Sequence, residues 1–172
     1  KEHCTWEMVC DLYARTSRIV LSIDPDAKVG GPAIAYDPRD QGEPYMRSFL
    51  AYCARNSLPL DFVCYHGYRK GHPREFEDMV QTVRAMVREE YPALPREPEY
   101  FLDEFNLWDT GEHQDTEYAA SYITAAHHFM KRGGITKAGY VSLNHFIPDN
   151  KPDSTVFECT GPFDKTTSQS GR

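Results

Sequence analysis

Alternation of short apolar runs with amphipathic segments constrains this chain of 172 residues more than any other feature. The apolar runs begin near residues 28, 60, 99 and 137, so successive starts lie 32, 39 and 38 residues apart. That spacing is the size of one strand–helix unit. Strands that alternate with helices in this way predict a parallel sheet covered by helices and joined by right-handed crossovers.

The periodicity of apolar side chains sets the bounds of the predicted elements. The strands are expected at 28–35, at 60–66, from 99 onward and at 138–146, and the helices at 5–23, 44–56, around 76–87 and at 116–132. Gly133-Gly134 is expected to end the last helix. The polar segment 164–172 is predicted to be disordered, which leaves 1–163 as one domain.

Composition narrows the class of protein. The chain has 19 Lys and Arg against 26 Asp and Glu, a net charge of −7, so nucleic acid is not expected as a partner. No apolar run approaches the length of a membrane span, and a membrane is not expected either. The five cysteines form no zinc or disulfide pattern, which predicts free buried thiols. Free thiols favour a reducing, cytoplasmic setting. No metal and no cofactor are expected.

Polar residues gather at the same end of every predicted strand. They are Gly30-Gly31-Pro32, His66-Gly67-Tyr68, Glu104-Phe105-Asn106 and Asn144-His145. In a (β/α)8 barrel the carboxyl ends of the strands form the catalytic face. The glycines are interpreted as structural, because no phosphate-binding glycine pattern follows them. The pair His127-His128 lies on a predicted helix and is interpreted as surface.

Glu104 ends an apolar, aromatic segment, and an asparagine and Trp108 follow it. A carboxylate beside an aromatic platform suits sugar chemistry, because an oxocarbenium-like transition state is stabilised by nearby negative charge. Two readings of Trp108 stay open, packing at the rim or stacking against a sugar. Glu104 could equally be a strand-end acid that pairs with an arginine.

Taken together, these motifs resemble glycoside hydrolase family 39, which contains β-xylosidases and α-L-iduronidases. The resemblance is carried by Val29-Gly-Gly-Pro-Ala33, by Pro59-Leu-Asp-Phe-Val63 with His66-Gly-Tyr68, and by Leu102-Asp-Glu-Phe-Asn106. It implies an α/β fold that is a partial (β/α)8 barrel, about strands five to eight with their helices. The N-terminal half of the barrel is then absent from this chain and is its expected partner.

The resemblance also implies the roles of the site residues. Glu104 is the expected nucleophile of a retaining glycosidase, with His66 and Tyr68 in contact with it and with the sugar. Asn106, Trp108, Asn144 and His145 are the further expected substrate-binding residues, and the substrate is a xylose-type or related glycoside. The acid/base glutamate of the family would lie before residue 1. The chain alone is therefore expected to be inactive, and to self-associate through its open strand edges.

Two departures from the family concern the site. The last strand lacks the tryptophan usual under the reacting sugar, and Asp103 stands where β-xylosidases usually carry threonine. Continuous alternation along the strand would turn Asp103 towards the helices, where it could cap one.

Two other protein classes compete with a glycosidase. A non-catalytic carbohydrate-binding protein would keep Trp108 and His66 without the acid. A doubly wound α/β protein would need a nucleophile elbow or a phosphate loop, and the sequence has neither.

Overall fold

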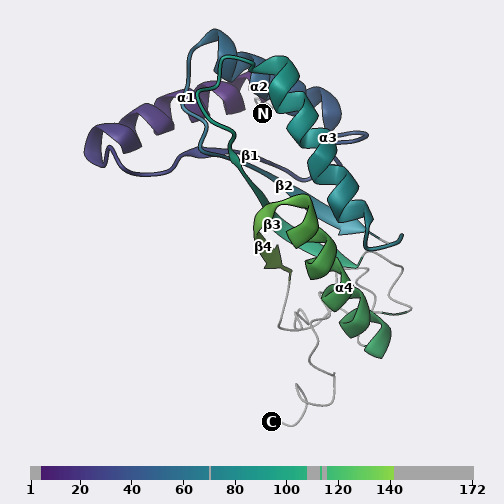
Figure 1. Cartoon of the computed structure of the whole chain (residues 1–172). Coiled ribbons are helices and arrows are strands. Elements are labelled where there is room, and N and C mark those ends of the chain that lie inside the picture. Colours follow the sequence, from purple (N-terminus) through teal and green to yellow (C-terminus); the bar gives the residue numbers. More distant parts are fainter. Residues whose placement is uncertain (1–4, 70, 108–112, 114–115, 142–172) are drawn as a thin grey trace, which may run out of the picture.

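The computed structural model describes residues 5–69, 71–107, 113 and 116–141, in which helices and strands alternate along the chain (Figure 1). The elements are, in order, α1 (Trp6–Ile23), β1 (Gly30–Ile34), α2 (Glu43–Arg55), β2 (Phe62–Arg69), α3 (Glu75–Glu90), β3 (Glu99–Leu107), α4 (Glu117–Gly133) and β4 (Ile135–Tyr140).

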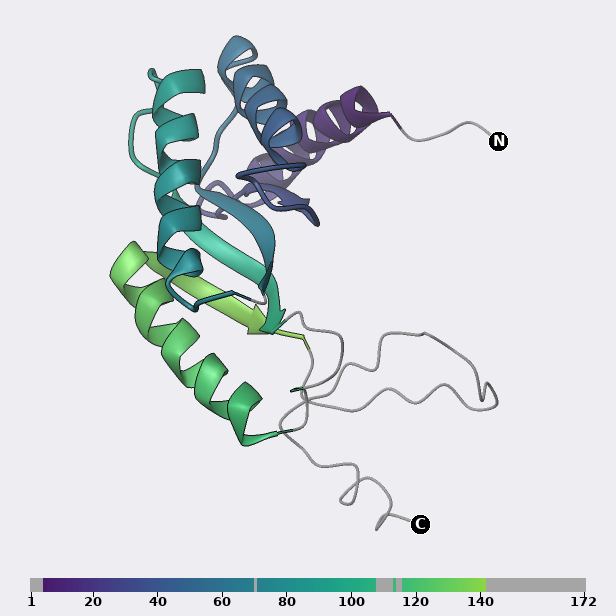
Figure 2. The same ribbon diagram turned by 90° about the vertical axis from the view of Figure 1, so that its right-hand side faces the viewer.

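The four strands form one sheet in the order β1-β2-β3-β4, and every neighbouring pair is parallel. Helices α2, α3 and α4 follow one another across one side of this twisted sheet (Figures 1 and 2). This arrangement confirms the predicted α/β class and matches part of a (β/α)8 barrel. The side of the sheet away from these helices corresponds to the interior of such a barrel.

The core lies between the sheet and its helices. Outward-facing side chains of the strands, such as Val63, Tyr65 and Leu102, are fully buried. They pack with the apolar face of α3, where Phe76, Met79, Val80, Val83 and Val87 are all buried, as predicted. α2 adds Met46, Phe49, Leu50 and Cys53.

Polar contacts fix the ends of the flanking helices. The Thr5 hydroxyl accepts a hydrogen bond from Met8 N and caps α1, which packs against α2 and β1. Thr116 caps α4 in the same way. Gly134 ends α4 with φ 91°, a left-handed conformation that favours glycine, as the sequence predicted.

Several strand bounds differ from the prediction. β4 begins at Ile135, earlier than expected, and residues 142–146 of the predicted strand lie outside the described residues. Gly30-Gly31-Pro32 opens β1 rather than ending it, so the expectation that it lies at the carboxyl end was wrong. The first glycine is needed where β1 meets β2, because a Cβ on Gly30 would lie 2.0 Å from the Phe62 carbonyl oxygen.

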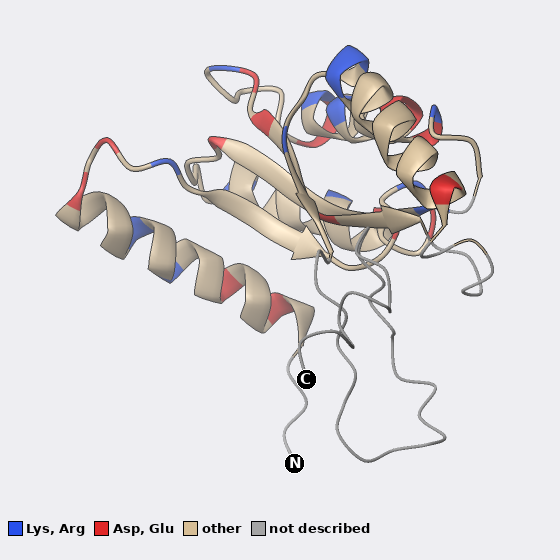
Figure 3. Ribbon diagram, turned by 90° about the horizontal axis from the view of Figure 1, so that it is seen from below, with Lys and Arg blue, Asp and Glu red and all other residues tan. Residues whose placement is uncertain are grey.

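Charged residues are spread over the outer helices and the connecting loops, with both signs interspersed (Figure 3). Cys10, Cys53 and Cys64 are free and buried, as predicted. Cys4 and Cys159 lie outside the described residues. None of the described helices is long and apolar enough to cross a membrane.

Candidate active site

A change of register in β3 shapes the candidate site. Pairing with β2 runs regularly from Phe62 with Glu99 to Tyr65 with Leu102, and then His66 pairs with Glu104. Asp103 is therefore an extra residue in β3, as in a β-bulge. The pairing of β3 with β4 shifts in the same stretch.

The bulge decides which side chains face the interior of the sheet. Before it, Tyr100 and Leu102 are buried against the helices, and after it Phe105 and Leu107 are. Asp103 and Glu104 therefore both project from the opposite face. The expectation that Asp103 points towards the helices was wrong, because the extra residue breaks the strict alternation on which it rested.

Glu104 meets two residues from β2 on that inner face. The Tyr68 hydroxyl donates a hydrogen bond to Glu104 Oε2 over 2.6 Å, and His66 Nδ1 lies 3.4 Å from the same oxygen. The other carboxylate oxygen, Oε1, accepts no hydrogen bond within the described part of the chain. The side chain of Glu104 is 40% exposed on the inner face.

A second carboxylate lies beside this group. Asp103 Oδ2 is 3.7 Å from His66 Nε2, so His66 stands between two acids. Burial raises the pKa of Asp103 above its usual value, and the charge of Glu104 adds to this rise, while His66 opposes it. The site thus places two carboxylates side by side and one ring in contact with both.

Other predicted site residues have different outcomes. Asn106 is only 6% exposed, and its amide donates to the Val141 carbonyl oxygen over 2.7 Å, which ties β3 to the chain just beyond β4. The structure does not bring it into contact with Glu104. Trp108, Asn144 and His145 lie outside the described residues.

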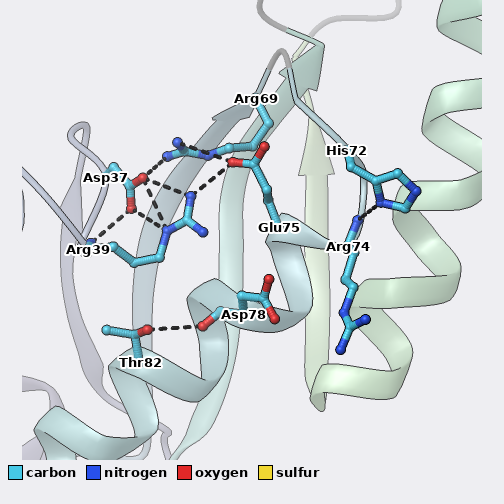
Figure 4. Close-up of polar contacts among 8 residues, drawn as sticks. All are labelled: Asp37, Arg39, Arg69, His72, Arg74, Glu75, Asp78 and Thr82. Carbon is cyan, nitrogen blue, oxygen red and sulfur yellow. Dashed lines mark hydrogen bonds and ion pairs between the residues drawn. The ribbon is translucent and has the colours of Figure 1, made fainter.

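A cluster of ion pairs, which we call the rim clamp, lies at the carboxyl end of β2 beside the first turn of α3 (Figure 4). It consists of Asp37, Arg39, Arg69 and Glu75. Arg69, the last residue of β2, lies 2.6 Å from Asp37 and 4.0 Å from Glu75. Arg39 lies 3.1 Å from the same aspartate and 3.0 Å from the same glutamate.

Each acid of the rim clamp therefore pairs with both arginines. The clamp joins the loop after β1, the end of β2 and the first turn of α3, and its side chains are between 16% and 31% exposed. Because Arg69 directly follows Tyr68, the clamp holds the backbone that presents the tyrosine to Glu104. These residues were not predicted from the sequence, although an arginine next to His-x-Tyr was a signal that could have found one of them.

No group of three or more His, Cys, Asp and Glu side chains arranged to hold a metal occurs among the described residues. His127 and His128 are both exposed on α4, where the sequence placed them. His127 Nδ1 lies 2.8 Å from the carbonyl oxygen of Ile123 in the preceding turn.

Comparison with known proteins identifies related chains. Residues 2–127 match the profile of the family described as glycosyl hydrolases family 39. A β-xylosidase of Geobacillus stearothermophilus is 36% identical over 102 residues, which are 49% of this chain and 19% of that protein.

Two solved structures extend the likeness to the fold. A glucosidase from Croceicoccus marinus superposes with a TM-score of 0.69 at 29% identity, over 80% of this chain and 28% of that one. A family 39 β-xylosidase from Caulobacter crescentus superposes with a TM-score of 0.67 at 25% identity, over 90% and 32%. This chain thus spans less than a third of the length of each of these relatives.

Proposed function

Because this chain belongs to glycosyl hydrolases family 39, we propose that it contributes the nucleophile, Glu104, to a retaining glycoside hydrolase. The observation that carries the proposal is the Tyr68 hydroxyl on Glu104 Oε2 at 2.6 Å, with the Glu104 side chain 40% exposed on the inner face of the sheet. One oxygen is thereby anchored and the other is left to react. The contact supports the role because an attacking carboxylate must be ionised and held in place.

The proposed reaction has two steps. Oε1 attacks the anomeric carbon, the bond from that carbon to the leaving-group oxygen breaks, and an acid protonates the departing oxygen. Water then hydrolyses the resulting glycosyl ester, with the former acid acting as base, and Glu104 is released as a carboxylate. The Tyr68 hydroxyl, 2.6 Å from Glu104 Oε2, holds the carboxylate in position for the attack.

The acid/base residue is proposed to come from outside these 172 residues. In a retaining enzyme the two carboxyl groups flank the bond that breaks, about 5–5.5 Å apart. Asp103 stands beside Glu104 on the same strand and would approach the sugar from the same side. We therefore assign the four strands to positions five to eight of a barrel, whose other half supplies the acid.

A β-xyloside is the proposed substrate. Its support is the 36% identity to the β-xylosidase of Geobacillus stearothermophilus. The family match over residues 2–127 covers both His66 and Glu104. The neighbouring glucosidase makes aryl glucosides the natural comparison. Initial rates on aryl xylosides and aryl glucosides, measured in the full-length polypeptide, rank the two sugars.

Replacing the nucleophile tests the mechanism. In the full-length polypeptide Glu104→Ala is expected to lower kcat by several orders of magnitude, on the order of 10⁴-fold or more, because the two-step path is lost. Azide or formate should restore part of the rate, since a small anion can attack the anomeric carbon from the vacated space.

Glu99→Gln is the matched control, because Glu99 is an acid of the same strand that pairs with Lys28 at its other end. This variant should keep kcat within about twofold. Near-normal kinetics in Glu104→Gln would refute the assignment. Full activity of the 172-residue chain alone on unactivated glycosides would refute the external acid.

A further inference from the structure

His66 is bracketed by carboxylates in a way that the proposed reaction does not by itself require. Its Nδ1 lies 3.4 Å from Glu104 Oε2, and its Nε2 lies 3.7 Å from Asp103 Oδ2. Both are ion-pair distances, and contacts of catalytic groups often tighten only when substrate binds. The side chain of His66 is only 16% exposed, so water competes little for either nitrogen.

The chemistry of the ring restricts how both contacts can be favourable. A neutral imidazole carries a hydrogen on one nitrogen and a lone pair on the other. A lone pair that faces an ionised carboxylate is repelled by it. With one additional proton on the pair formed by Asp103 and His66, both contacts become attractive, whether that proton sits on Oδ2 or on Nε2.

We propose that Asp103 is a positioning residue for Glu104: it holds one proton jointly with His66, and this makes His66 Nδ1 a hydrogen-bond donor to Glu104 Oε2. The inference rests on the proposed role of Glu104 and deepens it. The shared proton also neutralises the pair, so that the bulge brings a second acid to the site without adding a second full negative charge beside the nucleophile.

The ionisable groups around this pair are few within the described residues. Asp103 and Glu104 face His66 from β3, and Tyr68 neighbours it on β2 with ring centroids 6.1 Å apart. Cys64 lies close enough to Asp103 for the carboxylate to contribute to the raised pKa of the thiol. The proton is thus expected to reside on the pair of Asp103 and His66 rather than on a more distant group.

A double-mutant cycle in the full-length polypeptide tests the proposal. Asp103→Asn removes the charge with almost no change of shape. We expect kcat to fall about tenfold with KM within about twofold, the size of one lost charge-assisted contact. In a His66→Ala background the same substitution should cost less than about twofold, because its partner is already gone.

Rescue by the conservative variant supplies a readout that a purely structural role would not move. Asp103→Glu, which keeps the charge, should restore most of the rate. If the asparagine variant does not fold, Asp103→Ser replaces it in the same cycle.

Three results would overturn the inference: an equal cost in both backgrounds, no cost in the parent, or a cost that appears in KM alone. Each differs from failure of the proposed function, which would show as normal kcat in Glu104→Gln. A cost confined to the background that retains His66 supports the inference.

Discussion

The amino and carboxyl halves of the same strands are built in different ways. In the amino half the register of β2 with β3 is regular, and Phe62 and Phe101 stack on the inner face with centroids 4.6 Å apart. Lys28 pairs with Glu99 at the start of β3. In the carboxyl half the register slips by one residue, and Asp103 and Glu104 emerge together on the inner face.

The difference shows how one sheet can serve stability and chemistry at once. Paired strands that keep their register bury apolar surface on alternate positions, which is favourable but offers no reactive group. A single extra residue at the carboxyl end brings two consecutive acids to the inner face without disturbing the core on the other face, where Phe105 and Leu107 stay buried. Substitutions in the two halves should therefore have separable effects.

Among the substitutions that compare the two halves, loss of the Tyr68 hydroxyl is expected to lower kcat the most. Tyr68→Phe in the full-length polypeptide should lower kcat about 10²-fold, since it removes a short hydrogen bond to the nucleophile. Tyr91→Phe is the matched control, because its buried hydroxyl donates to the Leu58 carbonyl oxygen at the amino side. That control should cost about 1 kcal/mol of unfolding free energy and leave kcat within about twofold. Equal losses of kcat in both variants would contradict the separation.

Opening the rim clamp should have the next largest effect. Arg69→Met is expected to lower kcat about tenfold, because the backbone beside Tyr68 loses its anchor and small misplacements are costly in rate. Arg47→Met removes a comparable cluster, in which Arg47 lies 2.8–2.9 Å from Glu43, Glu89 and Glu90 between α2 and α3. Steady-state kinetics should show little change in that control. If Arg47→Met slows the reaction as much as Arg69→Met does, the rim clamp has no positioning role.

Changes in the amino half should affect stability and leave the rate nearly unchanged. Phe101→Leu removes the stacked ring and should lower the unfolding free energy by about 1 kcal/mol, measured by urea denaturation. Turnover per folded molecule should stay within about twofold. A tenfold loss of kcat here would mean that the two halves are mechanically coupled.

The buried thiols provide the smallest test, one that leaves activity untouched. Burial raises the pKa of Cys53 and of Cys64 from the usual 9.0 to about 12. At pH 8 these thiols should resist alkylation in the folded chain and react once urea unfolds it. Their contribution to stability should be complete below about pH 9 and be lost as the pH rises through about 12, because the unfolded thiols ionise first. Rapid alkylation of Cys53 or Cys64 in the native chain would show that the sheet opens.

The sequence predicted the elements of the fold better than the geometry at the carboxyl ends of the strands. Apolar periodicity located all four strands and the buried face of α3, because burial of one face of an element sets the spacing of its apolar residues along the sequence. It did not predict the bulge at Asp103, since a register slip changes pairing without changing the pattern of residue types. The rim clamp was missed because Asp37 and Glu75 are far apart in sequence and meet only when parallel strands end together.

Trapping the covalent intermediate tests the central claim most directly. A 2-fluoro glycoside with an activated leaving group slows the second step more than the first, so the glycosyl ester accumulates on the nucleophile. Incubation with the full-length polypeptide, followed by proteolysis and peptide mass spectrometry, locates the added mass. We predict one equivalent of glycosyl group on the peptide that contains Glu104, and none in Glu104→Gln. A label on any other carboxylate, including the neighbouring Asp103, would contradict the account.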